Sequence, residues 1–180
     1  MARETEPAAS VGEVRRLQPG DWETLRAVRL AALADAPQAF GSTVEREQAF
    51  DEAEWRRRAT NSHNFIAWRG DEPVGQVTVI GRGDGAGPDS RREWELVGMW
   101  VSPDARGTGS ADLLVAAAAE TAQAESAEHL ILWVADGNAR ARAFYLRAGF
   151  RPTGVRQRFE RRDGTAFDEE KLVMPLAAAK

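Results

Sequence analysis

A glycine-rich segment at residues 106–111, with the sequence RGTGSA, has the residue types that a backbone uses to hold a diphosphate. It fits the pattern Q/R-x-x-G-x-G/A, in which the glycines allow several N–H groups to turn toward one anion ahead of a helix. The pattern occurs three times, at residues 82–87, 106–111 and 161–166. Such a cradle also needs a buried strand before it and a helix after it.

Only the middle copy has both flanks. It follows the apolar run 96–101 and precedes an apolar helical segment that contains Leu113 and Leu114, and it has no acidic residue inside the loop. The first copy contains Asp84, which would repel a phosphate, and polar residues follow it. The third copy falls in a predicted hairpin turn. We therefore predict that residues 106–111 hold a diphosphate.

A second motif follows at residues 138–150, which read N-x-x-A-x-x-F-Y-x-x-x-G-F. Asn138 has the residue type of a helix N-cap, and Gly149 suits the left-handed position after a helix. Between them, Ala141, Tyr145 and Ala148 share one helical face, so small neighbours leave room for the tyrosine ring. Tyr145 is also the only tyrosine of the chain.

Together with V-x-P-x-x-R-G-x-G at residues 101–109, this motif resembles the GNAT superfamily of acetyl-CoA-dependent N-acetyltransferases. The resemblance covers about residues 14–176 and is most specific between residues 95 and 150. The chain has Ala111 as the last small residue of the loop, which is an accepted variant. It has Thr108 where a basic residue is frequent in the family.

The resemblance implies acetyl-CoA as co-substrate. In the family, the loop wraps the diphosphate of coenzyme A, mostly through backbone N–H groups, and the preceding strand splays from its neighbour to admit the pantetheine arm. The residues that the resemblance assigns to this cofactor site are Met99, Trp100, Val101, Arg106, Gly107, Thr108, Gly109, Ser110, Ala111, Asn138 and Tyr145.

The resemblance also implies roles in catalysis. The backbone N–H of Met99 is expected to polarise the thioester carbonyl, and the Tyr145 hydroxyl to meet the leaving sulfur. Some family members carry a glutamate base at the position of Glu95, and strand alternation would place Glu95, Val97, Met99 and Val101 on one face. Because the chain has no cysteine, an acetyl-cysteine intermediate is excluded, and we expect direct attack by a primary amine in a ternary complex.

Several alternatives remain open from sequence alone. Glu95 could instead be a solvated charge paired with Arg91 or Arg92. The acceptor could be a small-molecule amine, or a protein N-terminus or lysine; alternatively, the domain could bind coenzyme A as a regulatory module without transfer. The family places the acceptor against the N-terminal helices, where the candidate residues are Phe40, Ser42, Glu45, Glu47 and Trp55.

These residues must be positioned by a mixed α/β fold of the GNAT type, with about seven strands and about four helices. Hydrophobic patterning predicts helices at residues 22–34, 45–58, 109–124 and 139–148, the first capped by Asp21. It predicts strands at residues 14–17, 64–68, 74–80, 95–101, 130–134, 153–159 and 167–174. We expect a tail at residues 1–12, one domain at residues 13–176 and a tail at residues 177–180.

The composition of the chain limits the kinds of binding partner that we expect. A net charge of −4 gives no reason to expect nucleic acid or an anionic membrane as partner. The two histidines, His63 and His129, have no metal-ligand spacing, so no metal is expected. No signal segment or membrane span is visible, so we expect a cytoplasmic protein. Arginine greatly outnumbers lysine, as is typical of a GC-rich genome, and we expect a bacterial source; the resemblance favours a homodimer.

Overall fold

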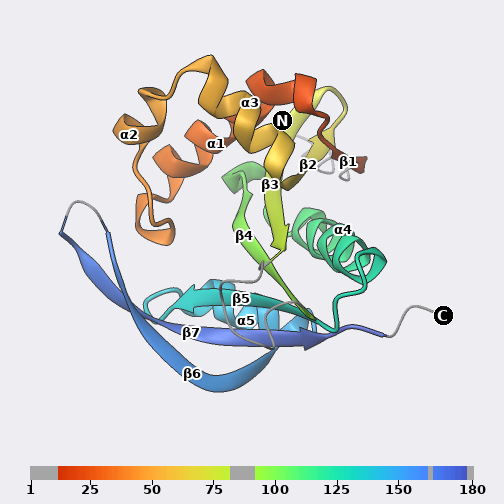
Figure 1. Ribbon diagram of the computed structural model, residues 1–180, viewed down its shortest axis with the longest axis vertical. Coiled ribbons are helices and arrows are strands. Elements are labelled where there is room, and N and C mark those ends of the chain that lie inside the picture. Colours follow the sequence, from red (N-terminus) through yellow and green to blue (C-terminus); the bar gives the residue numbers. More distant parts are fainter. Residues whose placement is uncertain (1–11, 82–91, 162–163, 178–180) are drawn as a thin grey trace, which may run out of the picture.

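A seven-stranded mixed sheet with the order β1-β2-β3-β4-β5-β7-β6 forms the centre of the molecule in the computed structural model (Figure 1). The structure describes residues 12–81, 92–161 and 164–177. The strands are β1 (Glu13–Arg16), β2 (His63–Arg69), β3 (Glu72–Gly81), β4 (Glu93–Val101), β5 (His129–Ala135), β6 (Arg151–Glu160) and β7 (Ala166–Pro175). All neighbouring strands are antiparallel except β4 and β5, which are joined by a helical crossover.

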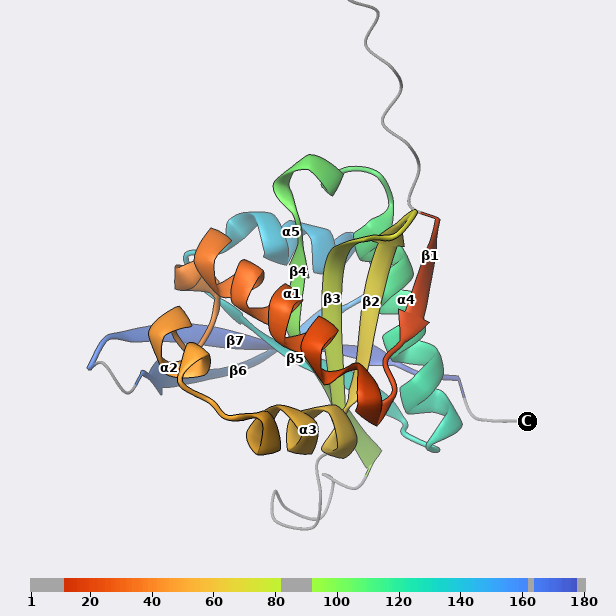
Figure 2. The same ribbon diagram turned by 90° about the horizontal axis from the view of Figure 1, so that it is seen from above.

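Five α-helices cover the sheet in the described part of the chain. They are α1 (Trp22–Asp35), α2 (Val44–Gln48), α3 (Glu52–Asn61), α4 (Ser110–Ala124) and α5 (Ala139–Arg147). Figure 2 shows α1 and α3 on one side of β2 and β3, with α4 on the other side. The mixed α/β fold predicted from the sequence is thereby confirmed. Among the described helices, none has the combination of length and apolar character that crossing a bilayer requires.

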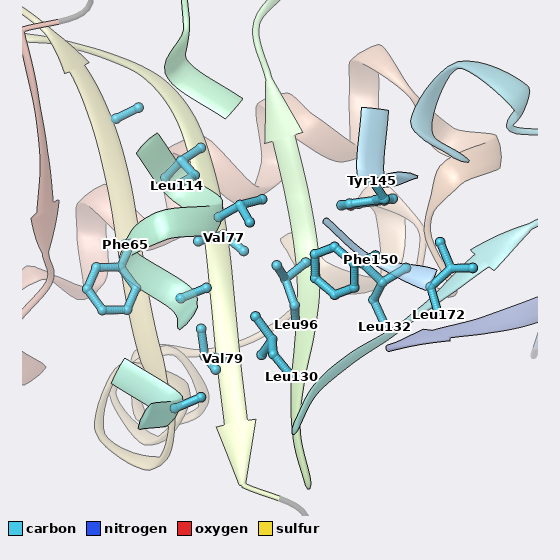
Figure 3. Packing of buried hydrophobic residues seen from close by; sticks show 14 of the residues in the cluster. Phe65, Val77, Val79, Leu96, Leu114, Leu130, Leu132, Tyr145, Phe150 and Leu172 are labelled. Carbon is cyan, nitrogen blue, oxygen red and sulfur yellow. The ribbon is translucent and has the colours of Figure 1, made fainter. Parts of the chain in front are cut away.

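The main core lies between the sheet and the helices α4 and α5. Leu114 of α4 packs there with Val77 and Leu96 from the sheet, and Tyr145 and Phe150 extend the same cluster toward β5 and β7 (Figure 3). Each fully buried aliphatic side chain in such a core contributes about 1.5–3 kcal/mol of transfer free energy. The Tyr145 ring is therefore held by the core of the protein, next to β4.

Two local predictions about helices are confirmed. The Asn138 side chain caps α5 by accepting the Ala141 N–H at 3.1 Å. Gly149, just after α5, has φ +104°, a left-handed conformation that glycine adopts without strain. The motif at residues 138–150 therefore folds as its residue types indicate.

Two other local predictions are wrong. Asp21 makes no capping bond to α1; its carboxylate accepts the Gln18 N–H at 2.7 Å, in the turn before the helix. The single helix expected at residues 45–58 is two helices, α2 and α3. The chain breaks between them because Asp51 starts a new helix, its side chain accepting the Glu54 N–H at 2.8 Å.

The strand β4 contains a bulge that overturns the predicted alternation. Gln76 pairs with Trp100 and Thr78 with Val97, so both Gly98 and Met99 lie opposite one residue of β3. Gly98 has φ +65°. One extra residue reverses which face the following side chains occupy. Met99 and Val101 consequently pack with Leu96 in the core cluster, so they do not share the face of Glu95.

Strands β4 and β5 pair over three positions only. The parallel register joins Glu93 with His129, Trp94 with Leu130, and Glu95 with Ile131. Beyond Glu95 the two strands separate, as Figure 1 shows. Because no other described strand fills this gap, the second half of β4 presents one open backbone edge inside the molecule.

A buried carboxylate links the helices on the N-terminal side. Glu47 is 1% exposed, and Arg29 donates to both of its oxygens at 3.0 Å, while Arg58 approaches at 3.5 Å. Burial alone would raise the pKa of Glu47, but the hydrogen bonds and charges of the two arginines lower it overall. The ionised carboxylate therefore stabilises the packing of α1, α2 and α3.

Replacing Glu47 by glutamine should lower the free energy of unfolding by roughly 3 kcal/mol at pH 7, because Arg29 would stay part-buried without its counter-charge. The pKa of Glu47 is depressed in the native state, so its contribution is complete above the unfolded pKa, near 4.3, and is lost as pH falls through the native pKa. Urea denaturation at several pH values measures this. Glu52, which forms an exposed ion pair with Arg56, is the control. Glu52→Gln should lower the free energy of unfolding much less than Glu47→Gln, and an equal loss would contradict the role assigned to Glu47.

Candidate active site

Two adjoining cavities occupy the gap between β4 and β5. The larger has a volume of about 830 Å³ and extends along residues 105–112; the smaller has about 330 Å³ and extends toward β6 and β7. Both are lined by Phe40, Met99, Asn138, Ala141 and Tyr145. These residues therefore stand at the junction between a long cavity and a compact one.

The loop before α4 exposes backbone N–H groups at the end of the larger cavity. Gly107 and Gly109 have φ +84° and +93°, which side-chain-bearing residues rarely adopt. Gly109 is the N-cap of α4 and has no side chain to cap it, so the first-turn N–H groups have no acceptor within the helix. The helix dipole adds positive potential at the same place. This end of α4 suits a diphosphate.

The two hydroxyl side chains of the loop bind the loop itself. Thr108 Oγ1 donates to the Ala105 carbonyl at 2.7 Å and lies 2.8 Å from Ser110 Oγ. Ser110 is 1% exposed. The predicted loop residues therefore fall into two groups. Thr108 and Ser110 form hydrogen bonds within the loop. The residues that line the larger cavity are Arg106, Gly107, Gly109 and Ala111.

Arg106 is held by the end of α1. Its guanidinium donates to Asp35 and, through Nε at 3.0 Å, to the Val101 carbonyl. The Trp100 indole N–H also donates to Asp35, at 2.9 Å. The charge of Arg106 is therefore balanced by a carboxylate that was not among the predicted site residues. Because 71 positions separate the two residues, no local pattern could have indicated the pair.

Backbone alternation along β4 determines which amides face the gap. The Ser102 N–H donates to the Val74 carbonyl at 2.8 Å, so the groups of Ser102 point toward β3. In an antiparallel pair the next residue points its groups away. Val101 therefore directs its N–H group into the gap, whereas Met99 lies in the bulge, where this alternation is interrupted. Trp100 directs its N–H toward β3, and its ring lines the larger cavity.

Tyr145 lies where the two cavities meet. Its side chain is 8% exposed, and its ring contacts those of Phe144 and Phe150 with centroids 5.3 and 5.6 Å away. Burial raises the pKa of Tyr145, so the phenol keeps its proton at neutral pH. Among the described residues, none forms a hydrogen bond with the hydroxyl. A protonated phenol with this placement can act as a proton donor.

Glu95 lines the smaller cavity together with Met99 and Tyr145. Arg92, one of the two arginines considered as its partner, donates instead to Glu128 at 2.5 Å. The other, Arg91, lies outside the described residues. The first copy of the loop motif, at residues 82–87, also lies outside them, and the third copy, at residues 161–166, is described only in part. Glu93, two residues before Glu95, is held by Lys171 at 2.7 and 2.9 Å.

Of the acceptor residues predicted from sequence, Phe40 lines both of these cavities and the other four line neither. Glu47 and Trp55 are buried in the helical layer, and the Ser42 hydroxyl accepts a bond from Arg46. The wall of the smaller cavity comes instead from the β6–β7 hairpin, through Gln157, Phe159, Phe167 and Glu169. Strand alternation predicts that Gln157 and Phe159 share one face of β6, and that Phe167 and Glu169 share one face of β7. It does not predict that the hairpin reaches the gap between β4 and β5.

Within the described ranges, no group of His, Cys, Asp and Glu residues could hold a metal ion.

Comparison with known proteins identifies relatives of this arrangement. The model of the Acetyltransferase (GNAT) family matches residues 29–150, a range that contains both sequence motifs. No curated protein matches the chain. A GNAT-family acetyltransferase from Streptococcus pneumoniae is similar in structure, with a TM-score of 0.73 at 18% identity, over 91% of this chain and 98% of that one.

Two further solved structures have the same fold. A ribosomal-protein-alanine N-acetyltransferase from Brucella melitensis has a TM-score of 0.68 at 22% identity, over 91% of this chain and 99% of that one. The putative acetyltransferase yncA from Salmonella typhimurium, solved with its cofactor acetyl-CoA, has a TM-score of 0.68 at 16% identity, over 93% of this chain and 95% of that one. The family resemblance read from the sequence is thereby confirmed.

Proposed function

The chain belongs to the GNAT acetyltransferase family, and we propose that it transfers the acetyl group of acetyl-CoA to a primary amine by direct attack in a ternary complex. The observation that carries the proposal is the junction of the two cavities. Tyr145 and Met99 line both cavities there, and Glu95 lines the smaller one, which supports a reaction centre between the separated strands. The larger cavity leads from this junction to the N-terminus of α4.

Acetyl-CoA is assigned to the larger cavity. The amides around Gly107 and Gly109 would hold its diphosphate, and the gap beside Met99 and Val101 would take the extended arm, whose amides can bond the free edge of β4. The yncA structure solved with acetyl-CoA supports this choice of co-substrate for the fold. Arg106 contributes by fixing the loop to Asp35, since its guanidinium is already bonded there.

The proposed reaction has three steps, and one residue acts in each of them. Glu95 accepts a proton from the acceptor ammonium, and the free amine attacks the carbonyl carbon of the thioester. The Met99 N–H donates to the oxygen that becomes negative in the tetrahedral intermediate. When the carbon–sulfur bond breaks, Tyr145 gives its proton to the leaving thiolate, and the nitrogen, which carries one excess proton after the attack, returns that proton to the Tyr145 phenolate; Glu95 releases its proton to solvent. The products are an acetamide and coenzyme A.

Product analysis tests this function. The protein should be incubated with acetyl-CoA and a mixed pool of primary amines and peptides, and the products identified by mass spectrometry. We expect one acetamide for each coenzyme A released, with acceptors found among the small amines. Release of coenzyme A at the same rate without any amine would contradict amine acetylation. Acetylated peptides as the main product would indicate a protein acceptor.

Replacing Gly109 by alanine should raise the Kd for acetyl-CoA by about tenfold or more, because a Cβ at φ +93° strains the cradle and stands beside its N–H groups. Gly164→Ala is a matched control. Gly164 belongs to the third copy of the motif, has φ +84° and, like Gly109, has open space where an added Cβ would lie. Both variants should lose similar stability. Calorimetric titration with equal Kd values for both variants would contradict the assignment of the loop.

A further inference from the structure

The smaller cavity has a wall that comes from one face of the β6–β7 hairpin. Gln157 pairs across the hairpin with Glu169, and Phe159 pairs with Phe167. Directly opposite residues in a sheet project from the same face, so two rings and two polar groups line the cavity side by side. None of these four residues belongs to the transfer steps described above.

Glu169 is a buried carboxylate without a cationic partner in the described part of the chain. It is 8% exposed, and one of its oxygens accepts the Gln157 side-chain amide at 2.6 Å. No lysine or arginine among the described residues forms an ion pair with it. The nearby Lys171 is committed to Glu93 at 2.7 Å. Burying a charge without a counter-charge is costly, so this position favours a cation supplied by a bound molecule.

The cavity as a whole is anionic and partly aromatic. Among the described residues that line it, the charged ones are Glu95 and Glu169, and the aromatic ones include Phe40, Phe159 and Phe167. Aromatic faces attract cations and also accommodate methylene groups. Its lining thus matches a molecule that is positively charged and flexible, with an aliphatic or flat middle part.

The two carboxylates lie at different levels of the cavity. Glu95 is in register with Ile131 of β5, whereas Glu169 is in register with Ala135, four residues further along the same strand. Four residues of strand correspond to about 13 Å. One carboxylate therefore stands near the point where β4 and β5 separate, and the other near the start of α5. A molecule with two cationic ends could meet both.

The hairpin also closes one side of this cavity. Arg161, at the end of β6, donates to the carbonyls of Pro37 and Gln38 at 3.1 and 2.8 Å. Phe159 packs so closely on Gly41 that a Cβ there would come within 2.6 Å of the ring. Figure 1 shows the hairpin reaching the segment between α1 and α2. A space of about 330 Å³ with this wall suits a small molecule.

We propose that Glu169 determines acceptor specificity, and that the acceptor is a small dibasic amine. One amino group reacts beside Glu95, Met99 and Tyr145, while the second cationic group binds the Glu169 carboxylate, which Gln157 orients. The inference rests on the proposed amine acetylation and adds the class of amine. Glu169 takes no part in bond making, so its removal should change which acceptor is used and leave acetyl-CoA binding intact.

The test compares pentane-1,5-diamine with pentylamine, which differ only in the second amino group. The wild type should prefer the diamine by about tenfold or more in kcat/KM, the discrimination that one charge-assisted hydrogen bond provides. Glu169→Gln should remove most of this preference, and Glu169→Asp should retain part of it. Asp168→Asn is the matched control, because it removes an exposed charge from the neighbouring position of β7 and should leave the preference unchanged.

The possible outcomes distinguish a failure of the specificity role of Glu169 from a failure of the proposed amine acetylation. If the wild type binds acetyl-CoA but acetylates neither amine nor any peptide, the proposed function fails, and the inference fails with it. If both amines are acetylated and Glu169→Gln keeps the wild-type preference, the inference alone is overturned. It is also overturned if the wild type uses pentylamine as well as the diamine, or prefers lysine-containing peptides to both. The Kd for acetyl-CoA, measured in each variant, shows that the fold is intact.

Discussion

Tyr145→Phe should lower kcat by about 100-fold or more while leaving the Kd for acetyl-CoA unchanged. The substitution removes one hydroxyl and keeps the ring that packs against Phe144 and Phe150. Without the phenol, the thiolate must leave unprotonated or take a proton from water. No second tyrosine exists in the chain to replace it. Steady-state kinetics with a saturating amine, together with calorimetric titration of acetyl-CoA, provide the measurement.

The pH dependence gives an independent check on the same residue. Burial raises the pKa of Tyr145 above its ordinary value near 10, so the acid form persists through the neutral range and beyond. Wild-type kcat should therefore show no decline attributable to this phenol at or below about pH 10. The acid role would be excluded by an unchanged kcat in the variant when a pre-steady-state experiment shows that the chemical step limits turnover.

Glu95→Gln is the second large effect that we expect. Well below the pKa of the acceptor amine, kcat should fall by about 100-fold, because nearly every acceptor then carries a proton that a base must remove. At higher pH the free amine becomes abundant, and the loss should shrink. The slope of log kcat against pH in the variant should consequently be steeper than that of the wild type. Rate profiles between about pH 6 and pH 9 measure the difference.

Glu93→Gln is the control for that experiment. Glu93 stands two positions earlier on β4, and its carboxylate is bound by Lys171. Removing this charge should cost stability, but the pH dependence of kcat should keep its wild-type shape. If Glu95→Gln and Glu93→Gln have equal profiles, neither carboxylate is the specific base, and water would be the better candidate for proton removal.

The parts of the site that the sequence predicted well are those made by neighbouring residues. The cap formed by Asn138 and the left-handed Gly149 are consequences of local backbone chemistry, and both are present. The loop with Gly107 and Gly109 differs from the other two copies of its motif in its predicted flanks, a buried strand and an apolar helix, and the structure has both of them, as β4 and α4. These signals act over a few residues, so one sequence is enough to see them.

The features of the candidate site that the sequence did not predict depend on contacts between distant segments of the chain. The bulge at Gly98 changes the face of Met99 because β3 and β4 differ by one residue at that point, which strand alternation cannot detect. Asp35 meets Arg106 only after α1 has packed on the sheet. Glu169 lines the smaller cavity because β7, not β6, pairs with β5, and neither strand reveals this order by itself.

Initial-rate kinetics with both substrates varied test direct transfer most directly. The account predicts intersecting lines in double-reciprocal plots, and an intact protein mass that does not rise by one acetyl group when acetyl-CoA is supplied without amine. The chain has no cysteine to carry an acetyl group, which agrees with attack by the amine itself. Parallel lines, together with an acetylated protein that then passes its acetyl group to the amine, would contradict the ternary complex.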